Sequence, residues 1–450
     1  MKNKVSILFL ATALLALLCG MLCGILAGLQ YVIPGFIKEI MPFNNLRPMH
    51  VTSVISWIVL AATGGIYYYM SEIEGQELFS KLLVKAHFFI FIVTGCLIYY
   101  SYYTKTYGGK EYLEFPPYLI LPVIAGWILF GISYFKTLSG KAKSWPVYFW
   151  MWGTGIVLMA YHLSEAYLWL HPSVGPDFIK ALAIQWKAGG SFVGSWNMLV
   201  YGTAIFLMAK IKGDDSIGRN RIAFFFYFLG LTNLMFGWAH HIYIVPTSPW
   251  LRYSAYIISM TEWIILGSMI YQWRKSLPVE LKIKNLMPYR FLMAADVWIF
   301  LNLILALLFS IPAINFFTHG THTTVAHSMG TTIGINTTIL MASLLYITKQ
   351  VYPAVQNKLT VAGFKIFNVS LLLFWISLLV AGVKKSIWQY FEQTISFGAM
   401  QDQLYWVYIA FLIFGVGIFS GLSLIAYQLM KAFIFIIFKS KPQKVPDVAL

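Results

Sequence analysis

Long apolar stretches, separated by short polar connections, recur from one end of the chain to the other. Each reaches about 20 residues, the length that crosses the hydrocarbon core of a bilayer as a helix. Because lipid offers no hydrogen-bond partners, the backbone groups of such a stretch must be satisfied within it, which favours α-helices. The pattern predicts about twelve transmembrane helices in a single domain over residues 1–450. The expected spans are 6–33, 49–70, 83–103, 116–136, 146–169, 188–210, 221–245, 252–274, 289–314, 323–348, 361–385 and 404–436.

Composition excludes a soluble protein. Of the 450 residues, 59% are hydrophobic and only 11% are charged, whereas a soluble domain carries roughly 25% charged residues. Most of the surface must therefore face lipid, and no stretch is left for a sizeable soluble domain. The predicted fold class is an all-α integral membrane bundle.

The net charge of +16 has a topological explanation. If the N-terminus is cytoplasmic, the predicted spans place 23 of the 32 lysines and arginines on the cytoplasmic side and 9 on the other side. This is the bias that orients membrane proteins. We therefore expect both termini in the cytoplasm, membrane lipid as the main partner, and no nucleic acid.

The histidines are not spread evenly through the membrane. Given this topology, eight of the nine fall near the outer ends of their spans or in the adjoining loops, and only His87 belongs to the inner side. Polar groups inside a membrane are costly and mark candidate functional sites. Imidazole is a common ligand of iron, copper and zinc, and of haem, so the sequence predicts a haem or metal centre in the outer half. The eight are His50, His162, His171, His240, His241, His319, His322 and His327.

Four local strings then carry a family resemblance. Residues 28–50 read GLQYVIPGFIKEIMPFNNLRPMH, residues 237–243 read GWAHHIY, residues 312–327 read PAINFFTHGTHTTVAH, and residues 400–404 read MQDQL. In this order and at these spacings they resemble the catalytic subunit of bacterial cytochrome c-dependent nitric oxide reductases. That family is a branch of the haem-copper oxidase superfamily, whose subunit I is a helical membrane bundle.

The resemblance implies a low-spin haem b, a high-spin haem b3 and a non-haem iron or copper ion. His50 matches the family's ligand of the low-spin haem, and His327 matches the ligand of the high-spin haem. His240 and His241 match two ligands of the non-haem metal. Glu262 matches a buried glutamate near the active site, where it would deliver protons or tune the metal. The alternative is that the carboxylate of Glu262 only bonds to a neighbouring helix.

One departure from the family concerns the low-spin haem. The family places its second ligand, a histidine, two residues after the high-spin one, where this chain has Met329. Residues i and i+2 of a helix point about 200° apart, so His327 and Met329 can serve two haems on opposite faces. Methionine is an accepted axial ligand. The alternative is that Met329 only packs, as membrane methionines commonly do.

A second departure concerns the non-haem metal. The positions of a histidine and two glutamates in the family become Gly189, Val193 and Asn197 here. Glycine and valine cannot bind metal, so His240 and His241 remain as only two ligands. Three outcomes stay open: replacement ligands from span 146–169, a weaker or different metal, or no second metal.

The string YHLSE in that span offers the replacement ligands. His162 and Glu165 lie three residues apart on one helix face, a spacing found in carboxylate-bridged metal sites of helical bundles. The alternative is that His162 and Glu165 pair with each other, with Lys187, or with a haem propionate.

The expected function is that of a respiratory haem oxidoreductase in the bacterial inner membrane, which reduces nitric oxide to nitrous oxide. Its substrate is a diatomic gas. Electrons would come from a cytochrome c-bearing subunit or a soluble cytochrome c, because the chain has no C-x-x-C-H motif for a covalent haem. The alternatives are nitric oxide dismutation, oxygen reduction by a terminal oxidase, and a non-catalytic haem protein that transfers electrons or senses a gas.

Overall fold

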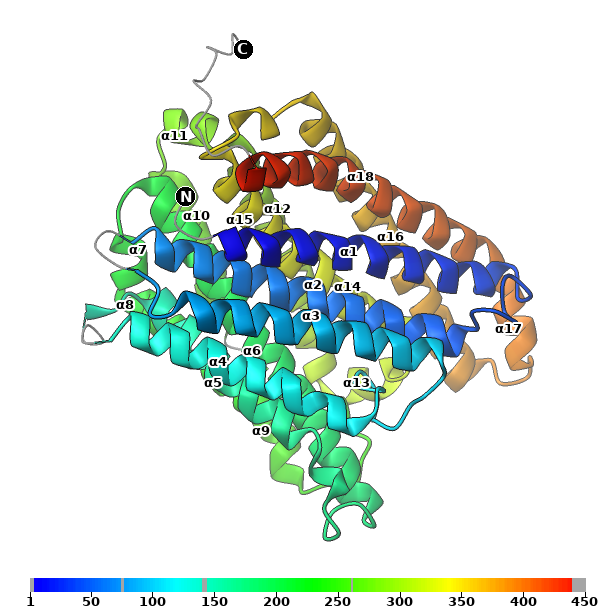
Figure 1. The fold of residues 1–450 in the computed structure, drawn as a ribbon. Helices are drawn as coiled ribbons and strands as arrows, with labels where there is room; N and C mark the ends of the chain where they lie inside the picture. Colours follow the sequence, from blue (N-terminus) through cyan, green and yellow to red (C-terminus); the bar gives the residue numbers. More distant parts are fainter. Residues whose placement is uncertain (1–3, 74–76, 140–143, 260–261, 439–450) are drawn as a thin grey trace.

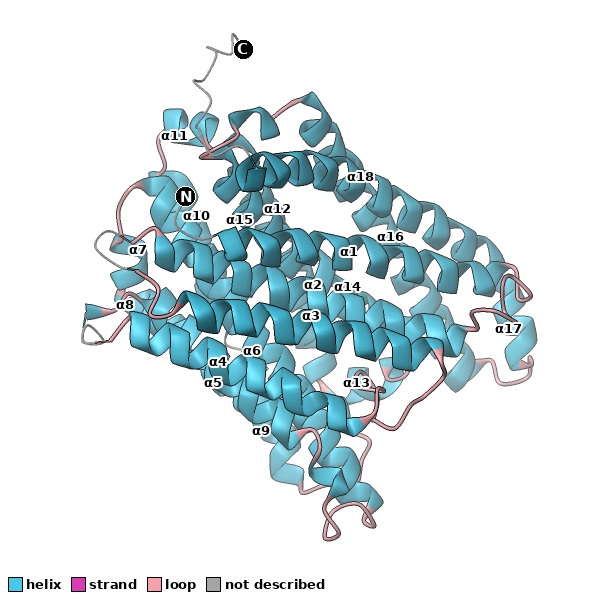
Figure 2. Ribbon diagram, in the orientation of Figure 1, coloured by secondary structure: helices cyan, strands magenta, loops and turns pink. Residues whose placement is uncertain are grey.

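The computed structural model describes residues 4–73, 77–139, 144–259 and 262–438. Figure 2 shows that regular structure in these ranges is helical, apart from one isolated bridge between Lys110 and Leu113. The α-helices are α1 (Lys4–Val32), α2 (Phe43–Ser71), α3 (Lys81–Tyr103), α4 (Ile120–Thr137), α5 (Val147–Glu165), α6 (Phe178–Lys212), α7 (Ser216–Arg219), α8 (Arg221–Phe236), α9 (Pro249–Ser259), α10 (Glu262–Ser276), α11 (Val279–Lys284), α12 (Leu286–Ser310), α13 (Pro312–Thr318), α14 (His322–Met329), α15 (Thr338–Lys349), α16 (Lys358–Phe391), α17 (Phe397–Gln403) and α18 (Tyr405–Phe438). The short 3₁₀ or π segments are η1 (Pro117–Leu119), η3 (Leu168–Leu170), η4 (Gly237–Ile242), η5 (Gly330–Thr337) and η6 (Pro353–Val355).

Ten helical runs in the described part of the chain are long and apolar enough to cross a membrane. They coincide with ten of the predicted spans, which confirms the all-α membrane bundle. The other two predicted spans, 146–169 and 252–274, correspond to α5 and to the pair α9 and α10. Helix α5 is not among the ten apolar runs, and α9 and α10 are short, at 11 and 15 residues. Twelve crossings are therefore not confirmed.

Helix α6 is longer than the predicted span 188–210. It has 35 residues and begins where the side chain of Asp177 accepts a hydrogen bond from the backbone N–H of Lys180 at 3.0 Å. Such a cap satisfies one of the N–H groups that the first turn leaves free. The helix ends at Gly213, whose φ of 86° is the left-handed conformation favoured by glycine. The polar first turns of α6 escaped prediction because hydropathy detects only the apolar part of a helix.

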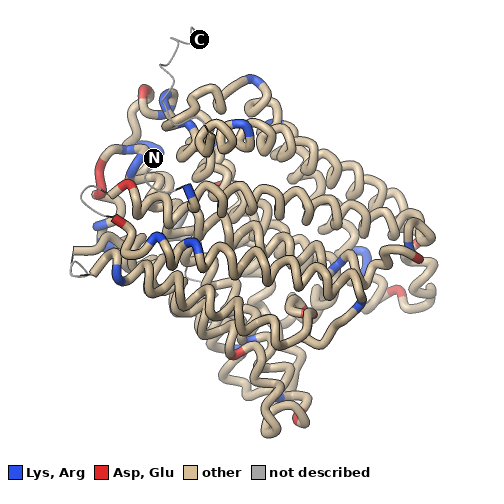
Figure 3. Tube along the Cα trace, viewed as in Figure 1, with Lys and Arg blue, Asp and Glu red and all other residues tan. Residues whose placement is uncertain are grey.

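Charged residues gather toward the two ends of the long helices, and the middle of the bundle carries few (Figure 3). We call the end at which α1 begins the proximal end, and the opposite end, at which α2 begins and α17 lies, the distal end (Figure 1). This distribution leaves a belt of apolar side chains between the ends, as a bilayer requires.

Small residues allow the closest helix contacts. A side chain at Gly64 of α2 would lie 2.8 Å from Cβ of Phe9 on α1, and one at Gly363 of α16 would lie 2.6 Å from the carbonyl oxygen of Gly421 on α18. In lipid, helices associate mainly through such close packing. The pairs α1–α2 and α16–α18 run along each other in this way and contribute to one continuous core that extends from Ile7 to Ile436.

Candidate cofactor and metal site

A cavity of ≈ 390 Å³ lies inside the bundle, bounded by α2, α5, α6, α8, η4, α12, α14 and η5. Its wall brings together residues that are far apart in the sequence but were expected to meet. The lining includes His50, His162, His240, His241, His327 and Met329. Of the other described histidines, none lines the cavity; His87 lies on α3 and shares a 3.1 Å hydrogen bond with Tyr67.

His50 is held by the neighbouring helix α1. Its Nδ1 lies 2.7 Å from the carbonyl oxygen of Gly20, and because a carbonyl only accepts, Nδ1 carries the proton. The ring fits against α1 because Gly24 has no side chain; a Cβ there would lie 2.8 Å from Nδ1. Only Nε2 then keeps a lone pair to offer to iron, the arrangement typical of a ligating histidine.

His327 and Met329 end helix α14, and the chain continues directly into the π-helical segment η5. The ring of His327 stands edge-on to Phe309, with 5.6 Å between ring centres, and its Nδ1 is buried without a hydrogen-bond partner. Asn302 of α12 donates to the hydroxyl of Thr331 at 2.6 Å, which ties η5 to α12. Wide turns of this kind occur frequently at functional sites.

His240 and His241 lie in the 3₁₀ segment η4, with their ring centres 4.2 Å apart. The ring of His241 stacks on Trp186 of α6 at 5.3 Å, and the ring of His240 lies 6.5 Å from that of His327. Both nitrogens of His240 are buried and have no hydrogen-bond partner. An unpaired buried imidazole is costly, and a metal ion bound to one of the two nitrogens would remove part of that cost.

Gly189, Val193 and Asn197 all lie on the face of α6 that lines the cavity. A Cβ added to Gly189 would have no atom within 4 Å, so this part of the wall is open. The side-chain oxygen of Asn197 accepts a hydrogen bond from Asn336 of η5 at 3.1 Å. The three positions thus surround space and contribute no metal-binding group beyond one amide.

His162 and Glu165 are joined to each other, and Glu165 is joined to α6. Nδ1 of His162 lies 2.8 Å from the carboxylate of Glu165, and Nζ of Lys187 lies 2.6 Å from both oxygens of that carboxylate. His162 lines the cavity and its Nε2 has no partner, whereas Glu165 is not a lining residue. The pairing corresponds to the alternative in which these residues bind each other and Lys187. Metal ligation by them stays a prediction.

The wall of the cavity fits haem better than it fits a second metal. Imidazoles on α2 and α14 and the thioether of Met329 are the axial ligands that haem proteins use, and they share one largely buried cavity. For a non-haem ion, in contrast, no three His, Cys, Asp or Glu side chains converge among the described residues. Catalytic sites usually need three protein ligands, so the described residues do not form such a site.

Sequence reasoning missed the residues that shape the cavity without binding a cofactor. Trp186, which stacks on His241, and Asn302, which anchors η5, both line it. An amide in the apolar run IFLNLIL was a usable signal for Asn302. No comparable signal in the sequence pointed to Trp186, because tryptophan is common throughout this chain. Glu262 begins α10, and its side chain lies outside the described residues.

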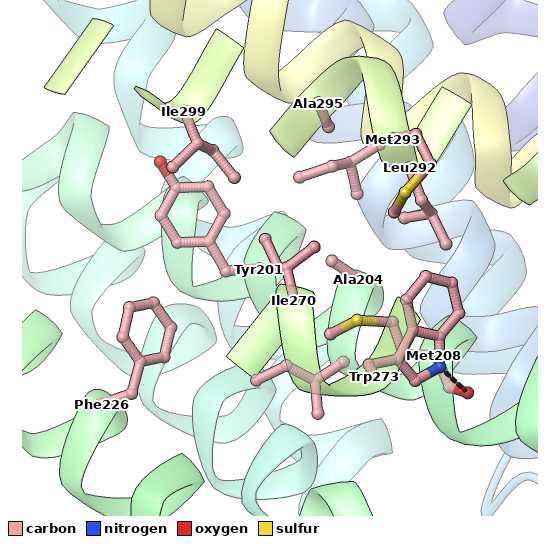
Figure 4. A pocket seen from close by; sticks show the side chains of 12 residues that line it. Tyr201, Ala204, Met208, Phe226, Ile270, Trp273, Leu292, Met293, Ala295 and Ile299 are labelled. Atoms are coloured by element: carbon pink, nitrogen blue, oxygen red, sulfur yellow. Dashed lines mark hydrogen bonds between the residues drawn. The ribbon is translucent and has the colours of Figure 1, made fainter. Parts of the chain in front are cut away.

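A second, smaller cavity of ≈ 30 Å³ lies on the proximal side of the first one, between α6, α8, α10, α12 and α15. Figure 4 shows its apolar lining, with Ala204 and Met208 from α6, Ile270 and Trp273 from α10, and Ala295 from α12. The two cavities share three wall residues, Tyr201, Phe226 and Ile299.

Comparison with known proteins agrees with this architecture. Residues 4–417 match the family described as cytochrome C and quinol oxidase polypeptide I. A nitric oxide reductase subunit from Stutzerimonas stutzeri is 23% identical over 467 residues, which cover 94% of this chain and 91% of that protein. A heme-copper terminal oxidase dimer solved by cryo-EM has a similar fold, with a TM-score of 0.74 and 14% identity, over 96% of this chain and 85% of that one.

Proposed function

Because the chain belongs to the cytochrome c and quinol oxidase polypeptide I family, and so to the haem-copper oxidase superfamily, we propose that it is a respiratory haem oxidoreductase that reduces nitric oxide to nitrous oxide. The observation that carries the proposal is the placement of His327 and His240. Their rings stand edge-on to each other inside one cavity, with 6.5 Å between ring centres and 77° between the ring planes, and three of their four ring nitrogens are buried without a partner.

The residues divide between two proposed haem positions. His50, with Nδ1 bound to Gly20, would offer Nε2 to a low-spin haem b, and Met329 would be its second ligand. His327 would hold a high-spin haem b3 on the opposite side of α14. Haems held in this way store electrons and bind diatomic gases.

A loop anchored by an arginine bounds the cavity at its distal end. The loop that contains Lys110, Glu111 and Leu113 forms its distal wall. Arg47 of α2 binds this loop through Glu114 at 2.8 Å and through Glu111 at 2.5 Å. Glu262 is proposed to supply protons or to tune the metal, as in the sequence-based expectation.

Nitric oxide is preferred as substrate because one relative, which aligns with 94% of this chain, is a nitric oxide reductase subunit. The overall reaction joins two molecules of nitric oxide and consumes two electrons and two protons to give nitrous oxide and water. With the termini in the cytoplasm, the cavity lies toward the outer face. A cytochrome c-bearing subunit or a soluble cytochrome c would deliver electrons there, because the chain itself has no C-x-x-C-H motif.

Gly189 and Val193 stand where the family has ligands of the non-haem metal, and neither residue can bind metal. Activities other than nitric oxide reduction are therefore considered. A member of the superfamily with an incomplete metal site could dismutate nitric oxide to nitrogen and oxygen, reduce oxygen, or only transfer electrons or sense a gas. Dismutation would release oxygen, oxygen reduction would consume oxygen and give water, and electron transfer or sensing would turn over neither gas, so gas analysis separates them.

The test is gas analysis on the purified, haem-loaded protein supplied with a reductant and isotopically labelled nitric oxide, and in a separate run with oxygen. Labelled nitrous oxide is expected, and replacement of His240 by alanine should abolish it. Replacement of His171 is the matched control, because this distal-end histidine does not line the cavity and bonds Ser173 instead. Evolution of oxygen, consumption of oxygen alone, or no turnover would each contradict nitric oxide reduction.

A further inference from the structure

A series of aromatic rings leads from the distal loop to the histidines of the cavity. Trp186 of α6 stacks on His241, with 5.3 Å between ring centres and 11° between ring planes. Trp186 also meets the ring of Tyr112 edge-on, at 6.3 Å and 76°. The ring of His241 lies 4.2 Å from that of His240, which in turn lies 6.5 Å from that of His327. Rings whose centres are up to about 7 Å apart interact directly, so the series is continuous from Tyr112 to the proposed haem ligand.

Tyr112 connects this series to the solvent. It lies in the loop between α3 and η1 and lines the cavity, yet it is 39% exposed. Trp186 lines the cavity as well and contacts both the tyrosine and His241. The two residues therefore link a surface that water reaches with the interior in which we place the haems.

The position of Tyr112 is held at a cost in free energy. Its φ of 70° lies in the left-handed region, which is unfavourable for a bulky side chain. The guanidinium of Arg47 lies over its ring at 5.8 Å and binds Glu114 of the same loop at 2.8 Å. A strained conformation persists only where the surroundings impose it, and such positions cluster at functional sites. The arginine and the loop together keep the phenol ring against Trp186.

The chemistry of the two side chains decides what the series can do. Tryptophan and tyrosine can each give up one electron to a strong oxidant, whereas phenylalanine resists this oxidation. Their oxidation requires a potential well above that of haem electron carriers, so these rings are not oxidised when a cytochrome delivers electrons. Hydrogen peroxide forms a sufficiently strong oxidant when it reacts with haem iron. Unless an electron is supplied, that oxidant damages the porphyrin and the side chains around it.

We propose that Tyr112 and Trp186 form a protective path that supplies an electron to the haem site when the site reacts with hydrogen peroxide. Trp186 gives an electron toward the cavity and regains one from Tyr112, so the oxidised residue ends at the surface. A soluble reductant can reach Tyr112 there and restore it. This role goes beyond the proposed reduction of nitric oxide and requires only that haem is bound in the cavity.

Electrons and atoms balance for one molecule of peroxide and the oxidised protein. The O–O bond breaks and takes up two electrons, one from the haem iron and one from Tyr112 through Trp186. One oxygen atom leaves as water with both protons of the peroxide, and the other stays at the haem. Because its ring is partly exposed, Tyr112 can release its phenolic proton to the solvent and become a neutral radical.

The test is electron paramagnetic resonance of the oxidised, haem-loaded protein, frozen within milliseconds of mixing with hydrogen peroxide. We expect a tyrosyl radical in the wild type, with a signal that narrows when the protein is made with ring-deuterated tyrosine. In Tyr112→Phe this signal should be lost, and a tryptophan radical should take its place. In Trp186→Phe, which keeps a ring against His241, both signals should be lost.

Two aromatic residues of the same region provide matched controls. Tyr107 lies in the same loop and is also 39% exposed, but its hydroxyl bonds Asn45 at 2.8 Å and it does not line the cavity. Trp169 lines the cavity and lies 5.0 Å from Nζ of Lys110, but its ring contacts no histidine in the described part of the chain. Tyr107→Phe and Trp169→Phe should therefore keep the tyrosyl signal. The optical spectrum before peroxide is added shows that each variant has bound its haems.

The stability of the haems gives a second measurement. During repeated additions of peroxide, the haem absorbance should bleach faster in Tyr112→Phe and in Trp186→Phe than in the wild type. The two control variants should bleach at the rate of the wild type.

Three results would overturn the inference. The first is the absence of a protein radical in the wild type, and the second is a tyrosyl signal that is unchanged in Tyr112→Phe or in Trp186→Phe. The third is equal bleaching in all the variants. None of these measurements uses nitric oxide, so a failure of the proposed function is seen separately in the gas analysis.

Discussion

His50 is bound to the carbonyl oxygen of Gly20 through its Nδ1, at 2.7 Å, across the contact between α1 and α2. The bond fixes both the tautomer and the direction of the ring, so that Nε2 is the only nitrogen left for iron. Helix α1 therefore orients the proposed ligand of the low-spin haem through this hydrogen bond. The space for the ring exists because Gly24 lies one turn after Gly20.

Gly24→Ala should therefore displace the ring of His50, since the new Cβ would meet Nδ1 at 2.8 Å. We expect the haem content of the purified protein to fall by about half, with loss of the low-spin spectrum, because one of two axially bound haems is affected. Gly28→Ala is the matched control on the same helix. Its Cβ would touch Leu412 and Phe411, each at 3.5 Å, which are ordinary contacts. A complete low-spin signal in Gly24→Ala would refute this role of α1.

The ion pair between Lys187 and Glu165 should contribute measurably to stability because it is largely buried. Their side chains are 19% and 13% exposed, and Glu165 also holds His162. Lys187→Met leaves a carboxylate with one partner in place of two, and we expect a loss of about 1–3 kcal/mol. Thermal unfolding in detergent, followed by haem absorbance, measures it.

The control for that variant is Lys180→Met on the same helix. Lys180 pairs with Asp177 at 3.4 Å, but the two side chains are 64% and 43% exposed. An exposed pair of this kind contributes about 0–1 kcal/mol. Equal effects of the two substitutions would mean that the Lys187 pair is fully hydrated and does not fix His162.

Much of the fold was predictable because lipid forces each apolar stretch to satisfy its own backbone, which makes hydropathy a direct signal for helices. The placement of His50, His240 and His327 in one cavity could also be anticipated, since topology fixes the depth of each residue. The features that decide the geometry of the ligands could not be anticipated from the sequence. The 3₁₀ path of η4, the π segment η5 and the stacking of Trp186 on His241 depend on packing between distant helices, which leaves no periodic pattern in the sequence.

The small apolar cavity shown in Figure 4 should be dry, because it offers almost no polar partner to a water molecule. Ala204→Val places two methyl groups in it and is expected to stabilise the protein by about 0.5–2 kcal/mol. Xenon under pressure should bind in the wild type and not in the variant.

Ala209→Val is the control for that substitution. Ala209 is 2% exposed and lines neither cavity, so overpacking should destabilise the protein by about 1–3 kcal/mol. Ordered water in the cavity would contradict the prediction.

Met329 provides the most direct test of how the low-spin haem is held, because its two possible roles give opposite results. If its thioether binds iron, Met329→Leu removes the sixth ligand and converts the low-spin spectrum to a high-spin one. Met329→His should keep the haem low-spin and lower its midpoint potential, since a Met/His pair raises the potential relative to two histidines. If Met329 only packs against the core, Met329→Leu conserves its volume and should leave both spectrum and potential unchanged. Met341→Leu, a fully buried methionine on α15 away from the cavity, shows what a packing substitution alone does to a redox titration.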